Sequence, residues 1–447
     1  MTSLSRNGYS IRKSEFSEED IQKLKDSLTV KVECRMFDHI PAKEYPLYGE
    51  NDKKLYLPKF YGLQRFGLPD RDVLGLGDEC PRMVFHGELR PEQYAQVNAY
   101  LNVANNPLHR GGIVSIKCGG GKSVIAIYIA CMLKRKTLFI VHKEFLGTQF
   151  AERIKMFAPE AKIGILKQKK VDIKDKDFVI ASLQSIAMRE YPQGTFDSFG
   201  LVIIDEIHRT SAEVFSQALI KTCCPYTLGL SATLNRKDGL RKVFQWFVGI
   251  PVIKPVSKSI DTNVEVLPYI YDCNDDSYCQ VLTMFNNRIN AVGMLSQVAD
   301  YEPRTEFIAD IILEKMCDGR KLIVLSERKN LLTTLFKILK IKECPYTVSY
   351  YIGGMKQADL DESAKSDIIL ATFQLAQEGL DIPALNTLIL ATGISDIQQS
   401  VGRILREKPE DRQMNPLVID IVDNFSIFKT RYNKRLEFYK KNKFNIK

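Results

Sequence analysis

A repeated alternation of short apolar runs with amphipathic segments constrains the fold of this chain more than any other feature. A first block has its runs at residues 111–118, 136–142, 176–183 and 200–206. A second block has its runs at residues 320–326, 346–354, 366–372, 386–392 and 416–423. Continuous apolar runs are typical of buried parallel strands, and their alternation with helices predicts doubly wound α/β sheets. Two blocks predict two such sheets in tandem.

The remaining segments predict how the 447 residues are divided. Residues 1–85 are aromatic and turn-rich, with a helix expected after Ser17, and they predict a small accessory domain that contains β structure. Residues 86–255 form the first α/β domain, and residues 256–447 form the second. The second domain carries a helical insertion near 273–302 and ends in a basic helix.

The composition narrows the class of protein. No apolar run reaches the roughly 18 residues that span a bilayer, and the N-terminus lacks the apolar core of a signal peptide. We therefore expect an intracellular protein without a membrane partner. The ten cysteines contain no C-x-x-C pair. We interpret Cys118, Cys131, Cys223 and Cys224 as buried free thiols.

The formal charge of +9 is concentrated at the C-terminus. Between Ile427 and Lys447, eight basic residues face a single acid, Glu437. This pattern suits a polyanion such as nucleic acid, although a solvated basic helix fits it equally well. An apolar face at helical spacing predicts that one side of the helix docks on the protein; its residues are Phe428, Tyr432, Leu436 and Tyr439.

The stretch SIKCGGGKSV, residues 115–124, predicts a phosphate site. Gly119, Gly120 and Gly121 can turn backbone N–H groups toward a phosphate at the start of the next helix. Lys122 would add charge at the β- and γ-phosphates, and Ser123 a hydroxyl ligand for Mg²⁺. Ile116 stands where the full phosphate-loop pattern has glycine, so a plain glycine-rich turn is the alternative.

The run LVIIDEIH delivers Asp205 and Glu206 to the C-terminal end of a strand, where α/β sheets place ligands. Asp205 would hold Mg²⁺, and Glu206 would orient and deprotonate an attacking water. Capping of the next helix is the alternative. Farther along, Ser231 and Thr233 follow another apolar run and could hydrogen-bond this acidic pair.

The stretch QQSVGRILR places Gln399, Arg403 and Arg406 at i, i+4 and i+7, on one face of an expected helix. Guanidinium groups suit the charge that develops on a transferred phosphoryl group. Taken alone, two nearby arginines would be interpreted as solvent-exposed surface residues without a specific role.

Together, KCGGGKS, DEIH, SAT and QQSVGRILR resemble motifs I, II, III and VI of the superfamily 2 helicases, in the same order. GELRPEQ, VHKEFLGTQF, IASLQSI, LIVLSERKNLL and ATFQLAQEGLDIP resemble the adenine-reading segment and motifs Ia, Ib, IV and V. The match spans residues 87 to about 425. KCGGGKS resembles the XPB and UvsW branch, and VHKEFL and LYLPKFYG are similar to helicases of large DNA viruses related to the poxvirus transcript-release helicase.

The resemblance implies two RecA-like domains with ATP bound between them, and an ATP hydrolase that moves along DNA, 3′ to 5′, as a monomer. It places the protein in the cytoplasm, the nucleus or a viral replication compartment. An RNA helicase or transcript-release factor is the alternative, and a non-catalytic nucleic-acid-binding scaffold is a third hypothesis. The implied nucleotide contacts beyond the loop are Arg90, Gln93, Gly379 and Asp381, with coupling through His208. The implied nucleic-acid contacts are His142, Lys143, Ser182, Gln184, Ser326, Arg328, Gly353, Gly354, Thr372 and Gln377.

The sequence departs from relatives at several positions. His208 replaces the last Asp of the DEAD-box motif, and Gln399 replaces the first His of its motif VI. Val141-His142-Lys143 stands where many members have a proline and a threonine. No R-E-D triplet of XPB proteins is found, and the 273–302 insertion is either a strand-engaging element or a packing helix pair. For Trp246 we favour a packing role over base stacking.

Overall fold

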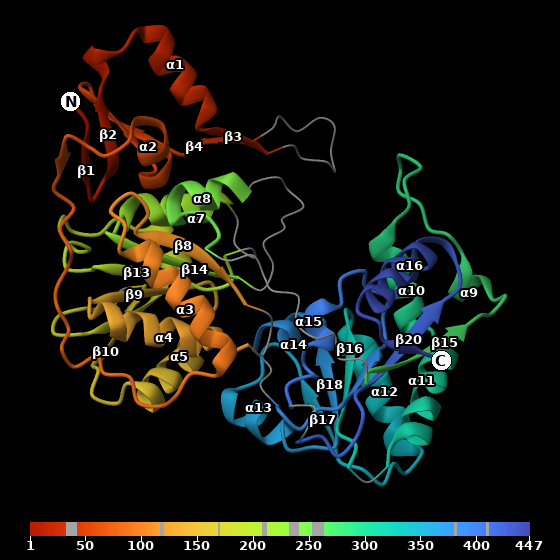
Figure 1. Cartoon of the computed structure of the whole chain (residues 1–447). Coiled ribbons are helices and arrows are strands. Elements are labelled where there is room, and N and C mark those ends of the chain that lie inside the picture. The colour runs from red at the N-terminus through yellow and green to blue at the C-terminus, as the bar shows by residue number, and fades with distance from the viewer. Residues whose placement is uncertain are drawn as a thin grey trace. The chain divides into compact units, whose positions relative to one another are not determined.

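The computed structural model divides into two compact units, Met1–Val256 and Ser257–Lys447 (Figure 1). The structure describes residues 1–32, 43–116, 120–168, 170–207, 212–231, 241–252, 263–317, 319–379, 382–407 and 411–447. Among these residues, no helix combines the length and the apolar character needed to cross a bilayer.

The first unit is built on a seven-stranded sheet with the order β11-β10-β12-β9-β13-β14-β8. Its strands are β8 (Gly111–Ser115), β9 (Thr137–Val141), β10 (Ile163–Lys167), β11 (Lys170–Asp172), β12 (Phe178–Ser182), β13 (Leu201–Ile204) and β14 (Tyr226–Ser231). Its helices are α3 (Pro91–Ala104), α4 (Lys122–Leu133), α5 (Glu144–Phe157), α6 (Leu183–Met188), α7 (Ala212–Lys221) and α8 (Arg241–Val248). All pairs are parallel except the one between β10 and β11.

Successive residues of the central strands serve two different cores. Val202 and Ile204 of β13 pack in one buried cluster, whereas Leu201 and Ile203 pack in the other. Because side chains alternate across a strand, apolar residues at every position mean that both faces of the sheet are covered. The predicted doubly wound arrangement is confirmed for this unit.

The N-terminal residues add a second sheet, with the order β5-β6-β2-β1-β7, and a separate β3–β4 pair. The elements are β1 (Ser3–Ser5), β2 (Gly8–Arg12), η1 (Lys13–Glu15), α1 (Glu18–Ser27), β3 (Thr29–Val32), β4 (Lys43–Pro46), β5 (Gly49–Glu50), β6 (Lys54–Leu57), α2 (Lys59–Phe66) and β7 (Arg71–Asp72). Ser17 Oγ accepts a hydrogen bond from Asp20 N–H at 3.1 Å and so caps α1 as predicted. Tyr61 of α2 packs edge-on against Trp246 of α8 with ring centroids 5.2 Å apart, which is the packing role that we favoured for this tryptophan.

The second unit contains a seven-stranded, all-parallel sheet with the order β17-β18-β16-β19-β20-β15-β21. Its strands are β15 (Glu265–Tyr271), β16 (Leu322–Ser326), β17 (Val348–Tyr351), β18 (Ile368–Thr372), β19 (Thr387–Leu390), β20 (Leu417–Asp423) and β21 (Asn445–Ile446). Its helices are α9 (Asp276–Cys279), α10 (Ala291–Asp300), α11 (Glu302–Lys315), α12 (Lys329–Ile341), α13 (Gln357–Ser363), α14 (Phe373–Gly379), α15 (Gln398–Val401) and α16 (Ser426–Lys441). Ile323 and Leu325 of β16 lie in one core, and Leu322 and Val324 lie in the other. This unit too is doubly wound.

The basic C-terminal helix α16 is anchored by one face. Phe428 and Tyr439 are buried, as the apolar spacing predicted. Arg435 is also buried, and its Nε lies 2.9 Å from Oδ2 of Asp420 in β20. The Tyr439 hydroxyl donates to the same carboxylate oxygen at 2.9 Å. One of the eight basic residues therefore belongs to the core.

Candidate functional site

The predicted phosphate loop lies at the carboxyl edge of β8. Lys117, Cys118 and Gly119 are outside the described residues, and the chain is described again from Gly120. Gly121 has φ +79°, in the left-handed region where a side chain is strained, and Lys122 begins α4 immediately after it. A glycine is therefore required at the point where the loop becomes a helix.

The strand order brings three predicted elements to one place. β14 lies between β8 and β13, so Ser231 at the end of β14 separates the phosphate loop from the acidic pair. Ile116 N–H donates to Ser231 O at 2.9 Å, which ties the loop to this strand. Ser231 is fully buried. Its predicted companions Thr233 and His208 lie outside the described residues.

Lys122 and Glu206 form an ion pair across β14, between Nζ and Oε1. Both side chains are only 15% exposed. Glu206 has φ +47°, a conformation that is uncommon for a residue other than glycine. Its N–H donates to Oδ1 of Asp205 at 2.9 Å, so the strained turn holds the two carboxylates in fixed relation. A phosphate entering this edge would compete with Glu206 for the Lys122 ammonium.

The donor set at this edge fits a magnesium ion that also binds a nucleotide. Ser123 follows Lys122 directly at the start of α4, and it would offer a hydroxyl oxygen, while Asp205 would offer a carboxylate oxygen. Mg²⁺ is usually held by one or two protein oxygens, with waters and substrate phosphates completing its octahedron.

The predicted adenine-reading segment contacts the loop itself. Gln93 is buried in the first turn of α3, and its Oε1 accepts from Arg90 N–H at 2.8 Å. Its Nε2 donates to Gly120 O at 3.1 Å. Arg90 is exposed, at the residue that precedes the helix. Gln93 thus connects α3 to the phosphate loop.

The arginine motif of the second unit is less helical than predicted. α15 ends at Val401, and the next hydrogen bonds run from Arg403 N–H to Ser400 O at 3.1 Å and from Ile404 N–H to Val401 O at 3.2 Å. These are i to i+3 turns, so the expectation of one α-helix from Gln399 to Arg406 is wrong. A tighter turn changes the angular positions that i, i+4 and i+7 spacing assumes.

Both arginines nevertheless lie near Tyr351, at the end of β17. Burial raises the pKa of the Tyr351 hydroxyl and Asp361 adds to this effect, whereas Arg403 and Arg406 lower the pKa. Arg403 is itself buried. Of the motif V residues expected to join this group, Gly379 ends α14 and Asp381 lies outside the described residues.

The predicted nucleic-acid contacts of the first unit share the same sheet edge. β9 and β12 are neighbours, with Ser182 opposite Val141. His142 and Lys143 follow β9, and Gln184 lies in the first turn of α6. The four residues therefore gather at the carboxyl ends of two adjacent strands.

In the second unit the corresponding residues divide into two kinds. Gly353 and Gly354 are exposed after β17, and Thr372 is half-buried at the end of β18. Ser326 is fully buried, and its hydroxyl accepts from Arg328 N–H at 3.0 Å and donates to Arg328 O at 2.9 Å. A nucleic acid cannot reach this hydroxyl without a rearrangement of the turn. The side chain of Gln377 is outside the described residues.

Arg328 is turned toward the insertion. Its Nε donates to Ser296 Oγ at 3.1 Å, and its Nη2 donates to Val292 O at 3.1 Å. Both acceptors belong to α10. The side chain expected on the nucleic acid thus fixes this helix to the end of β16.

Sequence reasoning missed two buried carboxylates of β20. Asp423 accepts from Arg304 Nε at 2.5 Å and from the Tyr278 hydroxyl at 2.8 Å, and Asp420 pairs with Arg435 as described above. An aspartate inside the apolar run PLVIDIVD was the available signal, because a buried carboxylate requires a partner.

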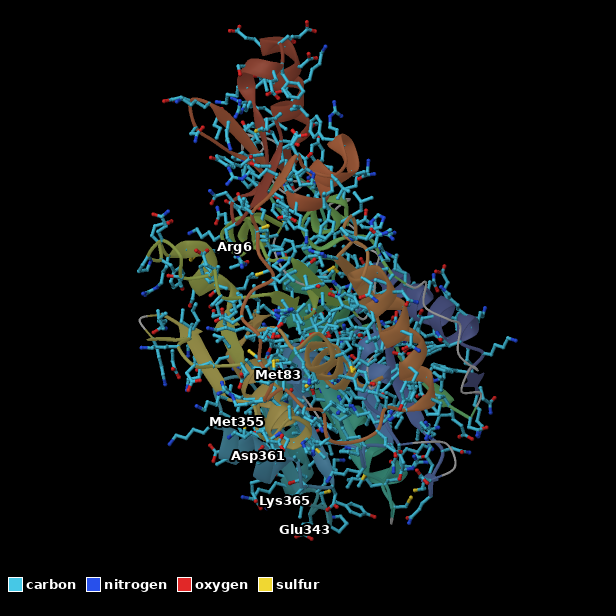
Figure 2. All side chains as sticks on the ribbon, turned by 60° about the vertical axis from the view of Figure 1, so that its left-hand side comes forward. Arg6, Met83, Glu343, Met355, Asp361 and Lys365 are labelled. Atoms are coloured by element: carbon cyan, nitrogen blue, oxygen red, sulfur yellow. The ribbon has the colours of Figure 1, made fainter. Side chains whose placement is uncertain are left out.

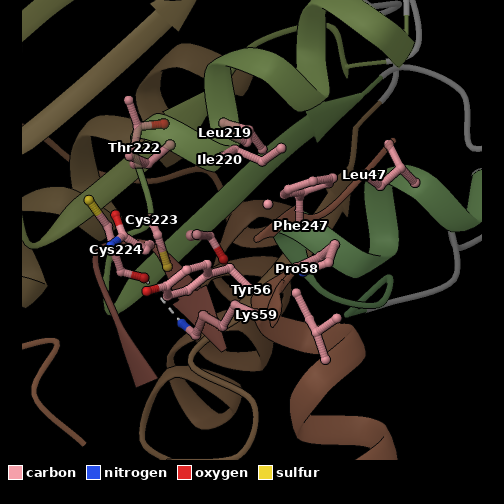
Figure 3. A pocket seen from close by; sticks show the side chains of 16 residues that line it. Leu47, Tyr56, Pro58, Lys59, Leu219, Ile220, Thr222, Cys223, Cys224 and Phe247 are labelled. Carbon is pink, nitrogen blue, oxygen red and sulfur yellow. Dashed lines mark hydrogen bonds between the residues drawn. The ribbon is translucent and has the colours of Figure 1, made fainter. Parts of the chain in front are cut away.

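A separate cavity of about 20 Å³ lies between the N-terminal residues and the large sheet of the first unit (Figure 3). Lys59 Nζ donates there to Cys224 O at 3.2 Å and to Pro225 O at 2.5 Å, and burial lowers the Lys59 pKa to about 8. From the neighbouring β1–β2 turn, Arg6 (Figure 2) donates to Phe199 O at 2.7 Å and to Cys223 O at 3.2 Å. The contacts to Cys223, Cys224 and Pro225 hold the loop that leads into β14, and the contact to Phe199 holds the chain just before β13.

The cysteines among the described residues are free thiols. Cys131 and Cys224 are buried, as expected, and burial raises the pKa of each to about 12. Such thiols are poor nucleophiles. Cys223 is partly buried, and Cys118 lies outside the described residues.

Comparison with known proteins matches two family models to this chain. Residues 86–236 match "Type III restriction enzyme, res subunit", and residues 304–408 match "Helicase conserved C-terminal domain". A putative ATP-dependent RNA helicase of Acanthamoeba polyphaga mimivirus is 36% identical over 100% of this chain and 86% of its own length. A putative helicase of Invertebrate iridescent virus 6 is 27% identical over 80% of this chain and 82% of its own length. Among solved structures, T4 UvsW is 18% identical, with 96% and 95% of the two chains covered and a TM-score of 0.35.

Proposed function

The chain belongs to the superfamily 2 helicases of large DNA viruses, and we propose that it is an ATP-driven motor in which hydrolysis at the Lys122–Glu206 edge powers movement along nucleic acid. The observation that carries the proposal is the meeting of Lys122, Asp205 and Glu206 at one sheet edge. A phosphate-binding ammonium and two carboxylates in this order are the groups that nucleotide hydrolysis needs.

Each residue of the first unit has a distinct role in the proposed reaction. Lys122 leaves Glu206 and binds the β- and γ-phosphates, which frees the carboxylate. Glu206 then orients a water and accepts its proton. Ser123 and Asp205 would hold Mg²⁺, which neutralises charge on the phosphates when it is bound. Gln93 holds the phosphate loop against α3 through its hydrogen bond to Gly120 O.

The second unit contributes the groups that complete turnover in this proposal. Arg403 and Arg406 stabilise the charge that develops on the γ-phosphoryl group, with Gln399 beside them. Because they belong to a different unit from Lys122, hydrolysis becomes dependent on movement of one unit against the other. This dependence is what converts an ATPase into a motor.

The nucleic acid runs over the carboxyl edges of both sheets in the proposed cycle. His142, Lys143, Ser182 and Gln184 would contact it in the first unit. Gly353, Gly354 and Thr372 would contact it in the second. Small side chains and backbone groups favour phosphate contacts, which allow stepping without regard to sequence.

DNA is the substrate that we propose first, with movement from 3′ to 5′, on the likeness of KCGGGKS to the DNA-translocase branch. RNA is the second candidate, and it is supported by the name of the mimivirus relative, an ATP-dependent RNA helicase. The interactions proposed above suit either backbone.

A steady-state ATPase titration tests the proposal and separates the two substrates. The purified chain is assayed with single-stranded DNA, forked and duplex DNA, single-stranded RNA and an RNA–DNA hybrid. We expect stimulation by one of them, abolished in Lys122→Ala and Arg406→Ala. Lys337→Ala, an exposed residue of α12, is the matched control and should behave as wild type. A rate unchanged by every nucleic acid contradicts the motor.

A further inference from the structure

The chain between α9 and α10 forms a small hairpin, residues 282–290. Thr283 and Ile289 pair as an antiparallel bridge, and Asn290 N–H donates to Leu282 O at 2.8 Å. At the tip, Asn287 N–H donates to Met284 O at 3.0 Å. In Figure 1 the chain between these two helices extends away from the sheet of its unit.

The backbone of the tip is well suited to its sequence. Asn287 has φ +58°, and asparagine tolerates this left-handed conformation better than most residues. A tight turn followed by one left-handed residue is a common way to close a three-residue hairpin loop. Phe285 therefore occupies the first loop position of a defined turn.

Phe285 is fully exposed, with a relative accessibility of 111%. Its neighbours Met284 and Ile289 are 46% and 43% exposed. Leaving a phenylalanine in water forgoes about 1.5–3 kcal/mol relative to burying it. An apolar tip of this kind is typical of a surface that meets a ligand.

The helices of the insertion pack against their unit, although Val281 and Val292 beside the hairpin are also exposed, at 49% and 64%. Tyr278, Met294, Leu295 and Val298 form a buried cluster with Phe428 of α16. The helices of the insertion therefore behave as a packing helix pair, one of the two possibilities that the sequence left open. From the hairpin, Leu282 at its base packs against that cluster, whereas the tip residues Met284 and Phe285 do not.

The charge around the tip suits a polyanion. Between Ser277 and Ala299 the chain has no acidic residue, and Arg288 lies in the hairpin itself. Asn286 and Asn287 follow Phe285 in the loop. An aromatic face with nearby amides and a guanidinium is a favourable surface for an unpaired base.

The base of the hairpin is tied to the proposed path of the nucleic acid. α10 begins one residue after Asn290, and Arg328 bonds to Val292 O and Ser296 Oγ of this helix. Arg328 itself directly precedes α12 at the carboxyl edge of β16. The hairpin is thereby attached to the sheet edge at which Gly353 and Thr372 lie.

We propose that the hairpin 282–290 is a base-stacking site, and that the ring of Phe285 stacks on an unpaired nucleobase of the strand that the motor follows. The proposal rests on the proposed function, because that function supplies the nucleic acid. Every base has a π face, so DNA and RNA are stacked alike.

The test compares the affinity of Phe285→Ala and wild type for fluorescein-labelled oligothymidylate and oligouridylate, by anisotropy. We expect the alanine variant to bind about 5- to 150-fold more weakly, the range that removal of one base–aromatic stack produces. Phe285→Tyr should restore binding. Ile341→Ala removes another strongly exposed apolar side chain, 79% exposed at the end of α12, and should bind as wild type.

A fluorescence measurement reports the stack directly. The chain has one tryptophan, Trp246, which packs against Tyr61. In Phe285→Trp, added oligonucleotide should quench the second indole beyond the quenching seen in wild type. The stacking site is overturned if wild type binds nucleic acid, Phe285→Ala binds it equally well, and the new indole is not quenched. The Phe285 ring would then belong to a protein contact. If wild type neither binds nor is stimulated by nucleic acid, the proposed function falls as well.

Discussion

Lys122 at the start of α4 and Glu206 after β13 form an ion pair across an intervening strand. Replacing either residue therefore tests the role that we propose for the pair. Glu206→Gln keeps the shape of the side chain but cannot accept a proton. We expect the ATPase rate to fall by a factor of about 100 or more, the usual effect when a general base is removed.

ATP binding should survive in Glu206→Gln, because a neutral amide competes with the phosphates for the Lys122 ammonium less strongly than the carboxylate does. Titration with a fluorescent ATP analogue measures this, and steady-state ATPase measures turnover. Glu190→Gln, with a side chain that is 93% exposed, is the control and should keep the wild-type rate. Normal turnover in Glu206→Gln would remove Glu206 from the chemistry.

Gln93→Ala removes the two hydrogen bonds that join Arg90, Gln93 and Gly120. A hydrogen bond of this kind contributes about 0.5–1.5 kcal/mol, so we expect KM for ATP to rise about 2- to 12-fold. The rate at saturating ATP should change less, since Gln93 is not placed on the attacking water. Gln96→Ala, one turn farther along α3, serves as the control. A fall in kcat with an unchanged KM would be the contrary result.

Arg435→Met leaves the buried carboxylate of Asp420 without its cation. Removing one partner of a buried ion pair costs about 3–5 kcal/mol, and urea unfolding of the whole chain should report it. Lys434→Met, exposed on the same helix, should change stability by less than about 0.5 kcal/mol. Adding Asp420→Leu to Arg435→Met should recover part of the stability. If Arg435→Met and Lys434→Met have equal free energies of unfolding, the Arg435–Asp420 ion pair does not stabilise the fold.

Neutralising the exposed lysines of α16 tests whether they bind nucleic acid, without unfolding the helix. Truncation after Phe428 is unsuitable, because it removes Arg435, Tyr439 and β21 together. We expect Lys434→Gln with Lys441→Gln to weaken binding and to lower the salt slope by about 0.7–0.9 for each lysine that had neutralised a phosphate. Lys337→Gln on α12 is the control. If the salt dependence of binding is unchanged, these lysines are solvated and do not contact the nucleic acid.

Asp177 and Arg82 provide a pH test in the first unit. Burial raises the pKa of Asp177, but the Arg82 guanidinium and the Lys162 N–H bind its carboxylate and leave the pKa lowered overall. A lowered pKa contributes stability above the unfolded value of about 3.9, and this stability is lost as pH falls through the folded value. The destabilisation caused by Arg82→Ala should therefore be constant from about pH 7 to 5 and shrink below about pH 4. Urea midpoints across this range measure it, and a difference that grows in acid would contradict the assignment. Lys162→Ala, whose backbone N–H is kept, is the control.

The sequence predicted those features that are repeated or locally encoded. Val202 to Ile204 and Leu322 to Leu325 are apolar at every position, which identified buried parallel strands. Ser17 was recognisable as a cap because it precedes a helical stretch. Glu206 was placed in the site because it closely follows such a strand, and Gly121 because it belongs to the glycine-rich loop before Lys122 and Ser123.

What depends on distant contacts could not be predicted. Nothing local in Arg328 indicates that its guanidinium binds α10 rather than a phosphate. The partner of Asp420 lies one helix away, and the two arginines of α16, Arg431 and Arg435, were equally plausible. The early end of α15 is different, because Gly402 directly after Val401 was a local signal against a continued helix.

The pairing of β21 with β15 also has a consequence for how the protein is made. Val266 of β15 lies opposite Ile446, so the first strand of this sheet meets one of the last residues of the chain. Domains generally fold in order as they leave the ribosome. The first unit, Met1–Val256, is complete once residue 256 has emerged, whereas the second must wait for residue 446 to close its sheet edge. A ribosome that stalls between residues 256 and 446 would carry a complete first unit and an incomplete second sheet, and this intermediate is the one on which we expect chaperones to act.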